Sequence, residues 1–360
     1  MSYRGHAVVL TGADDSSLGC VEALNLRENR WCLLSPLPLL LAACAAAVRR
    51  PSPRRCDSVS VSVCVREEEE LFVIGGVHRT TGQRSTQIFR LTHSRAHSER
   101  GLSLLADDDE TMQSLCGVWE SCEGLSLSRG RSHHGAVFFR GRCWVAGGLL
   151  TGEFTATRSV EALDFAQHTL TAMPPMLTPR MNTQLVVIET IYNDNSNNNN
   201  NNNSDSNSDK NSDNINSGGE REPRLFAVGG DMNGIAHASS SSIEVFDERE
   251  HCWRRETLFP ARTPQRARCA VAAQGERIYV FGGAHGSQAL SSWDFYDVRR
   301  RFWGSEVQEQ LRSDDSIVKD IAARHALSPQ DVQLLLSVDF TKLLGRPNGA
   351  KGTRAVSISV

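Results

Sequence analysis

A pair of adjacent glycines recurs along this chain, and each pair ends a short run of strand-forming residues. The run "IYVF" (278–281) is one example, and a weaker copy of the phrase, "AVVLTG", ends at Gly12. Glycine weakens the interior of a strand but suits a backbone that turns through unusual angles or is approached closely. Five copies of one local pattern indicate a repeat architecture. The four intact pairs are Gly75 and Gly76, Gly147 and Gly148, Gly229 and Gly230, and Gly282 and Gly283.

Two further phrases keep step with the glycine pairs. Downstream lies an acidic and apolar phrase, written "VEALN" (21–25), "VEALD" (160–164), "IEVFD" (243–247) and "WDFYD" (293–297). Six residues after its last position comes a large apolar residue: Trp31, Leu170, Trp253 or Trp303. Upstream lies an arginine before a run with strand-like character: Arg55, Arg131, Arg180 or Arg266. Each unit therefore predicts four short strands, with the arginine at the start of the first.

A four-stranded antiparallel meander cannot bury both of its faces alone, but radial stacking of several copies can. We expect Trp31, Trp253 and Trp303 to be wedged between neighbouring copies. In these glycine, acidic and tryptophan positions the chain resembles the kelch-repeat family over residues 4–303. The resemblance implies an all-β fold, a kelch-type β-propeller spanning residues 1–303.

The repeat is irregular in three units. Thr11 replaces the first glycine of the first unit, "STQIFRL" (85–91) stands in the acidic position of the second, and Leu170 replaces a tryptophan in the third. In the second unit Trp119 arrives late. These departures affect local blade geometry and leave the predicted fold unchanged.

The sequence gives about five blades, possibly six, whereas the resemblance implies six or seven. The first unit begins at its second strand, because "GHAVVLTG" (5–12) aligns with "GRCWVAGG" (141–148). Two explanations stay open. Either the alternating segment "TRAVSISV" (353–360), within 346–360, pairs with the first unit and closes the ring, or the chain is a piece of a longer propeller.

Residues 304–345 do not follow the repeat. Apolar residues at Ile317, Val318 and Ile321 have helical spacing, and Ser328 and Pro329 are typical of a helix start. The pattern predicts two short helices within 313–337. They lie across one side of the ring or form a degenerate sixth blade.

The composition argues against a nucleic-acid partner and indicates a reducing compartment. The net charge of −3 gives no overall field that favours nucleic acid. The ten cysteines include no C-x-x-C and no zinc-finger spacing with histidine, and no signal peptide is visible at the N-terminus. We therefore expect thiols in a reducing compartment, the cytoplasm or the nucleus.

Two segments need a separate interpretation. The apolar stretch 33–48 contains two prolines and is shorter than the roughly 20 residues of a spanning helix, so we expect a connection and buried insertion instead of a membrane anchor. The Asn-rich tract 193–219 cannot bury a core and is expected to be disordered. It is interpreted as a tolerated loop expansion, with self-association as the alternative.

The insertions are expected on one face of the disc. The Asn-rich tract and "REEEE" (66–70) fall between first and second strands, and the acidic insertion 92–118 falls between third and fourth strands. In a meander these turns share one face. The opposite face carries the arginines that open the first strands and the loops after the glycine pairs, which hold His78, Arg79, Arg84, Asp231 and His285.

The arginines have two interpretations. A ring of planar, permanently charged donors suits the binding of carboxylates. Alternatively, each arginine caps backbone carbonyls at a blade junction. The resemblance implies contacts with acidic peptide motifs, as in kelch-type substrate receptors. The predicted partner-binding residues are Arg55, Arg131, Arg180, Arg266 and His285, with Arg354 added if the ring closes.

No catalytic, metal or cofactor site is predicted. His133 and His134 are adjacent in an expected strand and face opposite ways, so they are poor joint metal ligands. No glycine pair is followed by the G-K-[ST] of a phosphate loop, and no nucleophile motif is present. The chain has only four tyrosines, too few for the copper site of some kelch oxidases. A lyase or isomerase using arginine and histidine in the channel is the remaining enzymatic alternative.

The resemblance implies a non-catalytic module that binds other proteins. Within the family we expect a scaffold or a substrate-recognition subunit. The alternatives are a ubiquitin-ligase adaptor acting with a separate partner and an organiser of actin. No BTB or F-box region is recognisable before the first blade.

Overall fold

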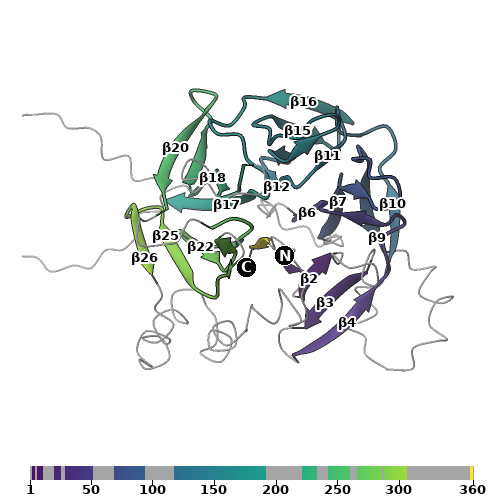
Figure 1. Ribbon diagram of the computed structural model, residues 1–360, viewed down its shortest axis with the longest axis horizontal. Coiled ribbons are helices and arrows are strands. Elements are labelled where there is room, and N and C mark those ends of the chain that lie inside the picture. The colour runs from purple at the N-terminus through teal and green to yellow at the C-terminus, as the bar shows by residue number, and fades with distance from the viewer. Residues whose placement is uncertain are drawn as a thin grey trace, which may run out of the picture.

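The computed structural model describes residues 2–4, 6–10, 20–25, 29–51, 69–93, 117–191, 221–232, 242–259, 266–285, 288–305 and 357–359. Its strands form five antiparallel meanders arranged around a centre, a five-bladed β-propeller (Figure 1). This confirms the all-β, kelch-type fold expected from the repeats. Among the described residues there is no helix, and no segment could cross a membrane as a helix.

Blades 1 to 3 follow one another along the chain. Blade 1 consists of β1 (Ser2–Tyr3), β2 (His6–Leu10), β3 (Val21–Asn25) and β4 (Arg30–Leu34). Blade 2 consists of β6 (Ala45–Arg49), β7 (Glu70–Ile74), β9 (Ile88–Thr92) and β10 (Val118–Ser121). Blade 3 consists of β12 (Gly135–Phe139), β13 (Arg142–Ala146), β15 (Val160–Asp164) and β16 (Thr169–Met173).

Blades 4 and 5 complete the set. Blade 4 consists of β17 (Gln184–Ile191), β18 (Arg221–Val228), β19 (Ser242–Asp247) and β20 (Cys252–Leu258). Blade 5 consists of β21 (Ala270–Gln274), β22 (Arg277–Phe281), β25 (Trp293–Asp297) and β26 (Phe302–Ser305), with β27 (Ser357–Ser359) added at its inner edge. Short ladders join the start of a blade to the loop after its glycine pair: β5 (Leu41–Ala42) with β8 (Val77–His78) and β11 (Arg131–Ser132) with β14 (Leu149–Leu150).

Strand alternation explains how the blades stack. Successive side chains of a strand point to opposite faces, so a central strand can bury both. In β18, Phe226 and Val228 pack in a cluster with blade 5, whereas Leu225 and Ala227 pack in a cluster with blade 3. All four are fully buried, so the hydrophobic core lies in the layers between blades.

The fourth strand carries the predicted aromatic residue. Trp253 is buried and its Nε1 donates to the carbonyl of Pro174 at 3.0 Å, and Trp303 is half-buried beside blade 4. Trp119 fills the same place in blade 2 and is 7% exposed. Trp31 differs, because 45% of its side chain is exposed. The wedge role is thus confirmed for Trp253 and Trp303, and wrong for Trp31.

Blade 1 has a first strand that the sequence alignment missed. Ser2–Tyr3 pairs with β2 across a turn at Arg4, whose φ is +48°. Blade 3 has the same turn at Arg140, with φ +50°. The phrase "YRG" (3–5) matches "FRG" (139–141), and this match could have revealed the strand.

The first strand of blade 2 is also different from the prediction. It is Ala45–Arg49, drawn from the apolar stretch 33–48, and the alternating run that starts at Arg55 lies outside the described residues. The apolar stretch is therefore no insertion. It provides the end of β4, the connection to blade 2, and most of that blade's inner strand.

Segment 357–359 does not pair with the first unit. It forms β27, which lies near the middle of the ring and runs parallel to β21 of blade 5 (Figure 1). The expected pairing with the first unit is wrong. The helices predicted within 313–337, the Asn-rich tract 193–219 and Arg354 lie outside the described residues.

Candidate functional site

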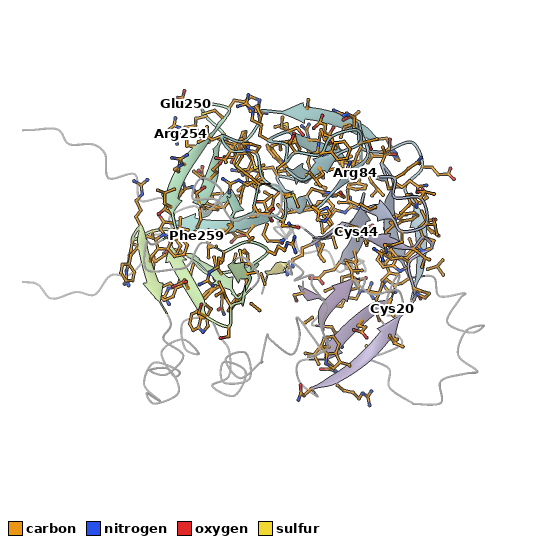
Figure 2. The ribbon with its side chains drawn as sticks, in the orientation of Figure 1. Cys20, Cys44, Arg84, Glu250, Arg254 and Phe259 are labelled. Carbon is orange, nitrogen blue, oxygen red and sulfur yellow. The ribbon has the colours of Figure 1, made fainter. Side chains whose placement is uncertain are left out.

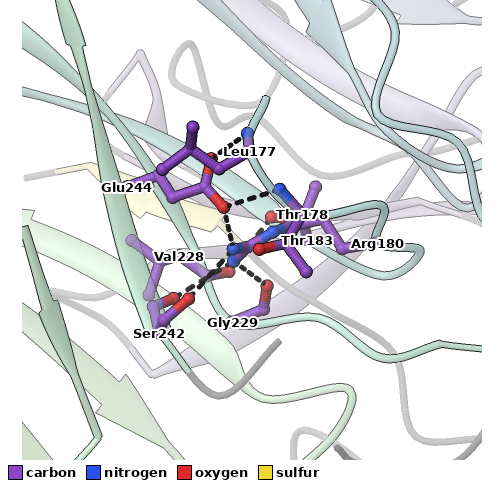
Figure 3. A network of polar contacts seen from close by, with 8 residues as sticks. All are labelled: Leu177, Thr178, Arg180, Thr183, Val228, Gly229, Ser242 and Glu244. Carbon is purple, nitrogen blue, oxygen red and sulfur yellow. Dashed lines mark hydrogen bonds and ion pairs between the residues drawn. The ribbon is translucent and has the colours of Figure 1, made fainter. Parts of the chain in front are cut away.

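Arg180, at the entrance to blade 4, is fully buried, and both of its terminal NH2 groups are hydrogen-bonded inside the protein (Figure 3). Its NH1 donates to the carbonyls of Gly229 at 2.7 Å and Ser242 at 3.1 Å, and its NH2 donates to a carboxylate oxygen of Glu244. The same carboxylate accepts the backbone N–H groups of Leu177 and Thr178 in the connection from blade 3. Arg180 and Glu244 thus fasten the incoming connection to the glycine turn and the third strand of blade 4.

The same arrangement recurs in two other blades. Arg131 donates to the carbonyls of Gly147 (2.9 Å) and Ser159 (3.2 Å) and pairs with Glu161 at 3.2 Å. Arg266 donates to the carbonyls of Gly282 (3.2 Å) and Ser292 (2.9 Å) and pairs with Asp294 at 2.9 Å. Exposure of Arg131, Arg180 and Arg266 is at most 1%. We call these three pairs the junction ion pairs.

This placement corrects the expectation that these arginines face a partner. Burial lowers the pKa of Arg131 and of Arg180, while Glu161 and Glu244 oppose that shift. Each guanidinium is held through its terminal NH2 groups by a carboxylate and two carbonyls of its own blade, which offsets much of the penalty of burying the charge. The alternative interpretation, a carbonyl cap at the blade junction, is the one that the geometry supports.

The glycine pair makes room for this junction, as blade 3 illustrates. Gly147 and Gly148 have φ of +70° and +89°, which side-chain-bearing residues rarely adopt. A Cβ on Gly147 would lie 2.4 Å from the carbonyl oxygen of Arg180, and one on Gly148 would lie 2.3 Å from that of Ser132. The N–H of Gly148 in turn donates to the Arg180 carbonyl at 2.8 Å. The pair therefore joins one blade to the next.

The acid partners of the arginines were not predicted, although the sequence holds the signal. Each is the second residue of the acidic phrase: Glu161 in "VEALD", Glu244 in "IEVFD" and Asp294 in "WDFYD". The serine before that phrase, at 159, 242 and 292, lends its carbonyl to the same arginine. Arginine, glycine pair, serine and acid together form one structural unit.

A scan against protein families matches the Kelch motif at residues 222–257. These residues run from the second to the fourth strand of blade 4 and include Gly229, Gly230, Glu244 and Trp253. The motif match in blade 4 and the five-bladed arrangement together support a kelch-repeat β-propeller. A search of curated proteins finds no match.

The propeller has a second repeated position, two residues after the junction arginine in blades 3 to 5 and two residues after Leu41 in blade 2. Ala43, His133, Asn182 and Arg268 occupy it in blades 2 to 5, each with φ between +50° and +56°. The N–H of His133 donates to the Ala43 carbonyl at 2.9 Å, and the N–H of Asn182 donates to the His133 carbonyl at 2.7 Å. These two hydrogen bonds link the starts of blades 2, 3 and 4. We call this set the channel mouth.

The channel mouth carries positive charge. Burial, and after it the nearby Arg268 and Arg84, lower the pKa of His133 to about 4. Arg84 comes from the loop after β8 in blade 2 (Figure 2), where its Nε donates to the Ser132 hydroxyl and its NH1 to the Leu150 carbonyl. Asn182 donates to the buried Asp231 at 2.7 Å. The cations Arg84 and Arg268 are thus half-buried near His133, while the carboxylate of Asp231 is buried behind Asn182.

The other residues considered for a site are either buried in the core, located at the channel mouth, or not described by the structure. His134 is buried with a strongly lowered pKa caused first by burial, so it belongs to the core, while its neighbour His133 lies at the mouth. Arg55 lies outside the described residues, and the side chain of His285 is not described. In the part of the chain that the structure describes, no group of three or more His, Cys, Asp or Glu side chains is placed to hold a metal ion.

Exposed apolar side chains lie on the face of the propeller that carries the channel mouth. Phe154, in the loop after β14, is 90% exposed, and Leu40 and Leu177, in the connections into blades 2 and 4, are each 47% exposed. Connections into blades and loops between second and third strands share one face of a meander. We call it the connection face. Its described part combines apolar residues with a cationic centre.

Proposed function

We propose that this kelch propeller is a binding module that holds a protein partner on its connection face, with an acidic group of the partner at the channel mouth. Kelch propellers generally bind protein partners. The observation that carries the proposal is the pair of cations at the mouth: Arg84 and Arg268 both lie near His133, whereas the carboxylate of Asp231 is buried and accepts a hydrogen bond from Asn182. The junction arginines, in contrast, are already neutralised inside the blades.

The chemistry of the mouth suits a carboxylate. Arginine presents a fixed fork of donors that matches a carboxylate in two-point contacts. Arg84 and Arg268 are half-buried, which strengthens an interaction with an anion relative to bulk water. The exposed Phe154, Leu40 and Leu177 supply apolar area around this centre, and aromatic anchors often dominate binding energy at protein interfaces.

A charge-matched comparison tests the proposal. Arg84→Gln/Arg268→Gln removes two cations from the mouth, and Arg254→Gln/Arg299→Gln removes two exposed cations from the outer strands and turns. Binding of a fluorescent pool of short acidic peptides is measured by anisotropy, beside a pool with Gln and Asn in place of Glu and Asp. The proposal expects loss of acidic-peptide binding, at least tenfold, in the first variant alone.

Two outcomes would contradict this function. Equal weakening in both variants would mean that only overall charge matters, and equal binding of the acidic and amide pools would remove the carboxylate from the account. The finer roles implied by the family resemblance remain predictions: scaffold, ubiquitin-ligase adaptor or actin organiser. The peptide sequences selected at the mouth would separate them.

A further inference from the structure

The hydroxyl of Ser132 joins two side chains of the channel mouth. Arg84 donates through Nε to Ser132 Oγ at 3.2 Å and through NH1 to the Leu150 carbonyl at 2.9 Å. On the other side, Nδ1 of His133 lies 3.1 Å from the same serine oxygen. Ser132 itself is fully buried. One buried hydroxyl therefore holds a guanidinium from the loop of blade 2 and an imidazole from the start of blade 3.

The donors and acceptors of this group determine where its protons lie. An arginine side chain only donates, so Ser132 must accept the hydrogen bond from Arg84. The hydroxyl hydrogen of Ser132 then needs an acceptor, because a buried hydroxyl without one is costly. Among the described residues, the acceptor that it reaches is Nδ1 of His133. Nδ1 therefore carries no proton, and the proton of the neutral ring is on Nε2.

Both side chains keep a donor for another molecule. NH2 of Arg84 and Nε2 of His133 have no hydrogen-bond partner among the described residues. These two nitrogens are also open to solvent, unlike the buried and unpaired Nε1 of Trp144. Each side chain is fixed at its other end by Ser132. A donor that is already held in place loses less freedom when it binds a ligand.

The next blade junction has neither polar residue of this group. The residue after the junction arginine is Ser132 in blade 3 but Met181 in blade 4. In the loop of blade 3, Ala156 stands where Arg84 stands in blade 2, because in both loops the N–H of the next residue donates to the carbonyl of the second glycine. The fold therefore requires neither a hydroxyl nor an arginine at these positions. The group is a special feature of the junction between blades 2 and 3.

We propose that Ser132 is a positioning residue of the channel mouth, and that it holds the Nε2–H of His133 and the NH2 group of Arg84 as donors for a carboxylate of the partner. This inference deepens the proposed function and rests on it for the identity of the ligand. An ionised carboxylate has two acceptor oxygens, so it can take a donor from each side chain. His133, with a pKa of about 4, donates as a neutral ring at pH 7.

Nitrogen NMR of the full-length chain tests the proton arrangement without any ligand. Long-range proton–nitrogen correlation separates a ring nitrogen that carries a proton from one that does not, and His133→Asn identifies the signals. At pH 7 we expect the proton of His133 on Nε2. Ser132→Ala should shift the Nδ1 signal, because it removes the hydrogen bond to that atom. Ser159→Ala is the matched control, since it removes a buried hydroxyl of the same blade that has no partner among the described residues, and it should leave the signal unchanged.

A proton on Nδ1 of His133 in the parent protein would overturn the proposal. An Nδ1 signal that is the same in both serine variants would also overturn it.

Binding of the acidic peptide pool tests what the arrangement is for. Ser132→Ala should weaken binding severalfold although it changes no charge, whereas Ser159→Ala should not. In the parent protein, the acidic pool should shift the Nε2 signal of His133, and the pool with Gln and Asn should not. Equal binding by the two serine variants would contradict the positioning role. No binding by the parent would overturn the proposed function and the ligand named here, while the spectra of the free protein would still decide the proton arrangement.

Discussion

Blades 2 and 4 fill the same position at the blade entrance with residues of opposite polarity, an apolar pair in blade 2 and an ion pair in blade 4. In blade 4 the junction holds Arg180 and Glu244 as a fully buried ion pair. In blade 2 the corresponding residues are Leu41 and Phe89, which lie together in one hydrophobic cluster with Val73. The register is the same, because Glu244 is paired with Ala227 and Phe89 with Val73 at matching positions of the two sheets.

The difference shows that the junction must be filled and satisfied, but that it need not be charged. A buried ion pair and a well-packed apolar pair of similar size often give comparable stability, whereas half of an ion pair does not. In blade 2 both members of the pair are apolar. The pair is therefore the structural unit, which explains why the arginines are not available to a partner.

The largest expected effect comes from breaking one junction ion pair. Arg180→Leu leaves Glu244 buried without its cation, and we expect a loss of about 3–5 kcal/mol of unfolding free energy. Urea denaturation followed by circular dichroism measures it. The exposed Arg254→Leu is the control, and a loss below about 1 kcal/mol is expected there. Similar losses in both variants would contradict the role given to the buried pair.

The converse change in blade 2 should also be costly. Leu41→Arg places a cation where Phe89 offers no carboxylate, and an uncompensated buried charge costs several kcal/mol. Adding Phe89→Glu should recover part of the lost stability, measured by the same denaturation. If Leu41→Arg were as stable as the parent protein, the apolar junction of blade 2 would not be closely packed.

The glycine turn is common to blades 2, 3 and 4, so its loss should be harmful whichever chemistry fills the junction. Gly148→Ala would place a Cβ 2.3 Å from the Ser132 carbonyl at a positive φ. We expect a loss of about 2–3 kcal/mol, from backbone strain and the shift of a neighbouring carbonyl. Gly152→Ala also has a positive φ, but no atom lies within 4 Å of its Cβ. Its loss, measured by thermal melting, should be nearer 1 kcal/mol.

The smallest effect concerns the channel mouth, where blade 2 has Ala43 and blade 3 has His133. The folded pKa of His133, about 4, is below its ordinary value of 6.5. The unfolded chain therefore binds the proton more tightly, and His133 lowers stability as pH falls from 6.5 through 4, with no effect above. His133→Asn should flatten the decline in melting temperature over that window. His168→Asn, at an exposed turn with similar φ, should not.

Several parts of this structure could be predicted from the sequence because a local phrase determined them. The glycine pairs and Trp253 stand in register with the blades that they predict. Two features could not, for physical reasons. The first strand of blade 2 lacks the arginine that precedes the first strands of blades 3 to 5, so the alternating run after Arg55 was the stronger local signal. Ser2–Tyr3 is too short for alternation to appear.

The site was predicted less well than the fold. Sequence placed Arg131, Arg180 and Arg266 correctly at the starts of first strands, but whether an arginine at that position is exposed depends on its partner. Glu161, Glu244 and Asp294 are distant in sequence and meet these arginines only when the sheet forms. The left-handed positions of His133, Asn182 and Arg268 are visible only in the backbone.

A double-mutant cycle at the blade 4 junction tests the central claim most directly. The free energy of unfolding is measured by urea denaturation for the parent protein, Arg180→Leu, Glu244→Phe and the double variant. The account predicts strong coupling: the double variant, which reproduces the residue types of blade 2, should be more stable than the sum of the single losses implies by about 2–3 kcal/mol. Additive losses would contradict the claim that the two residues act as one unit.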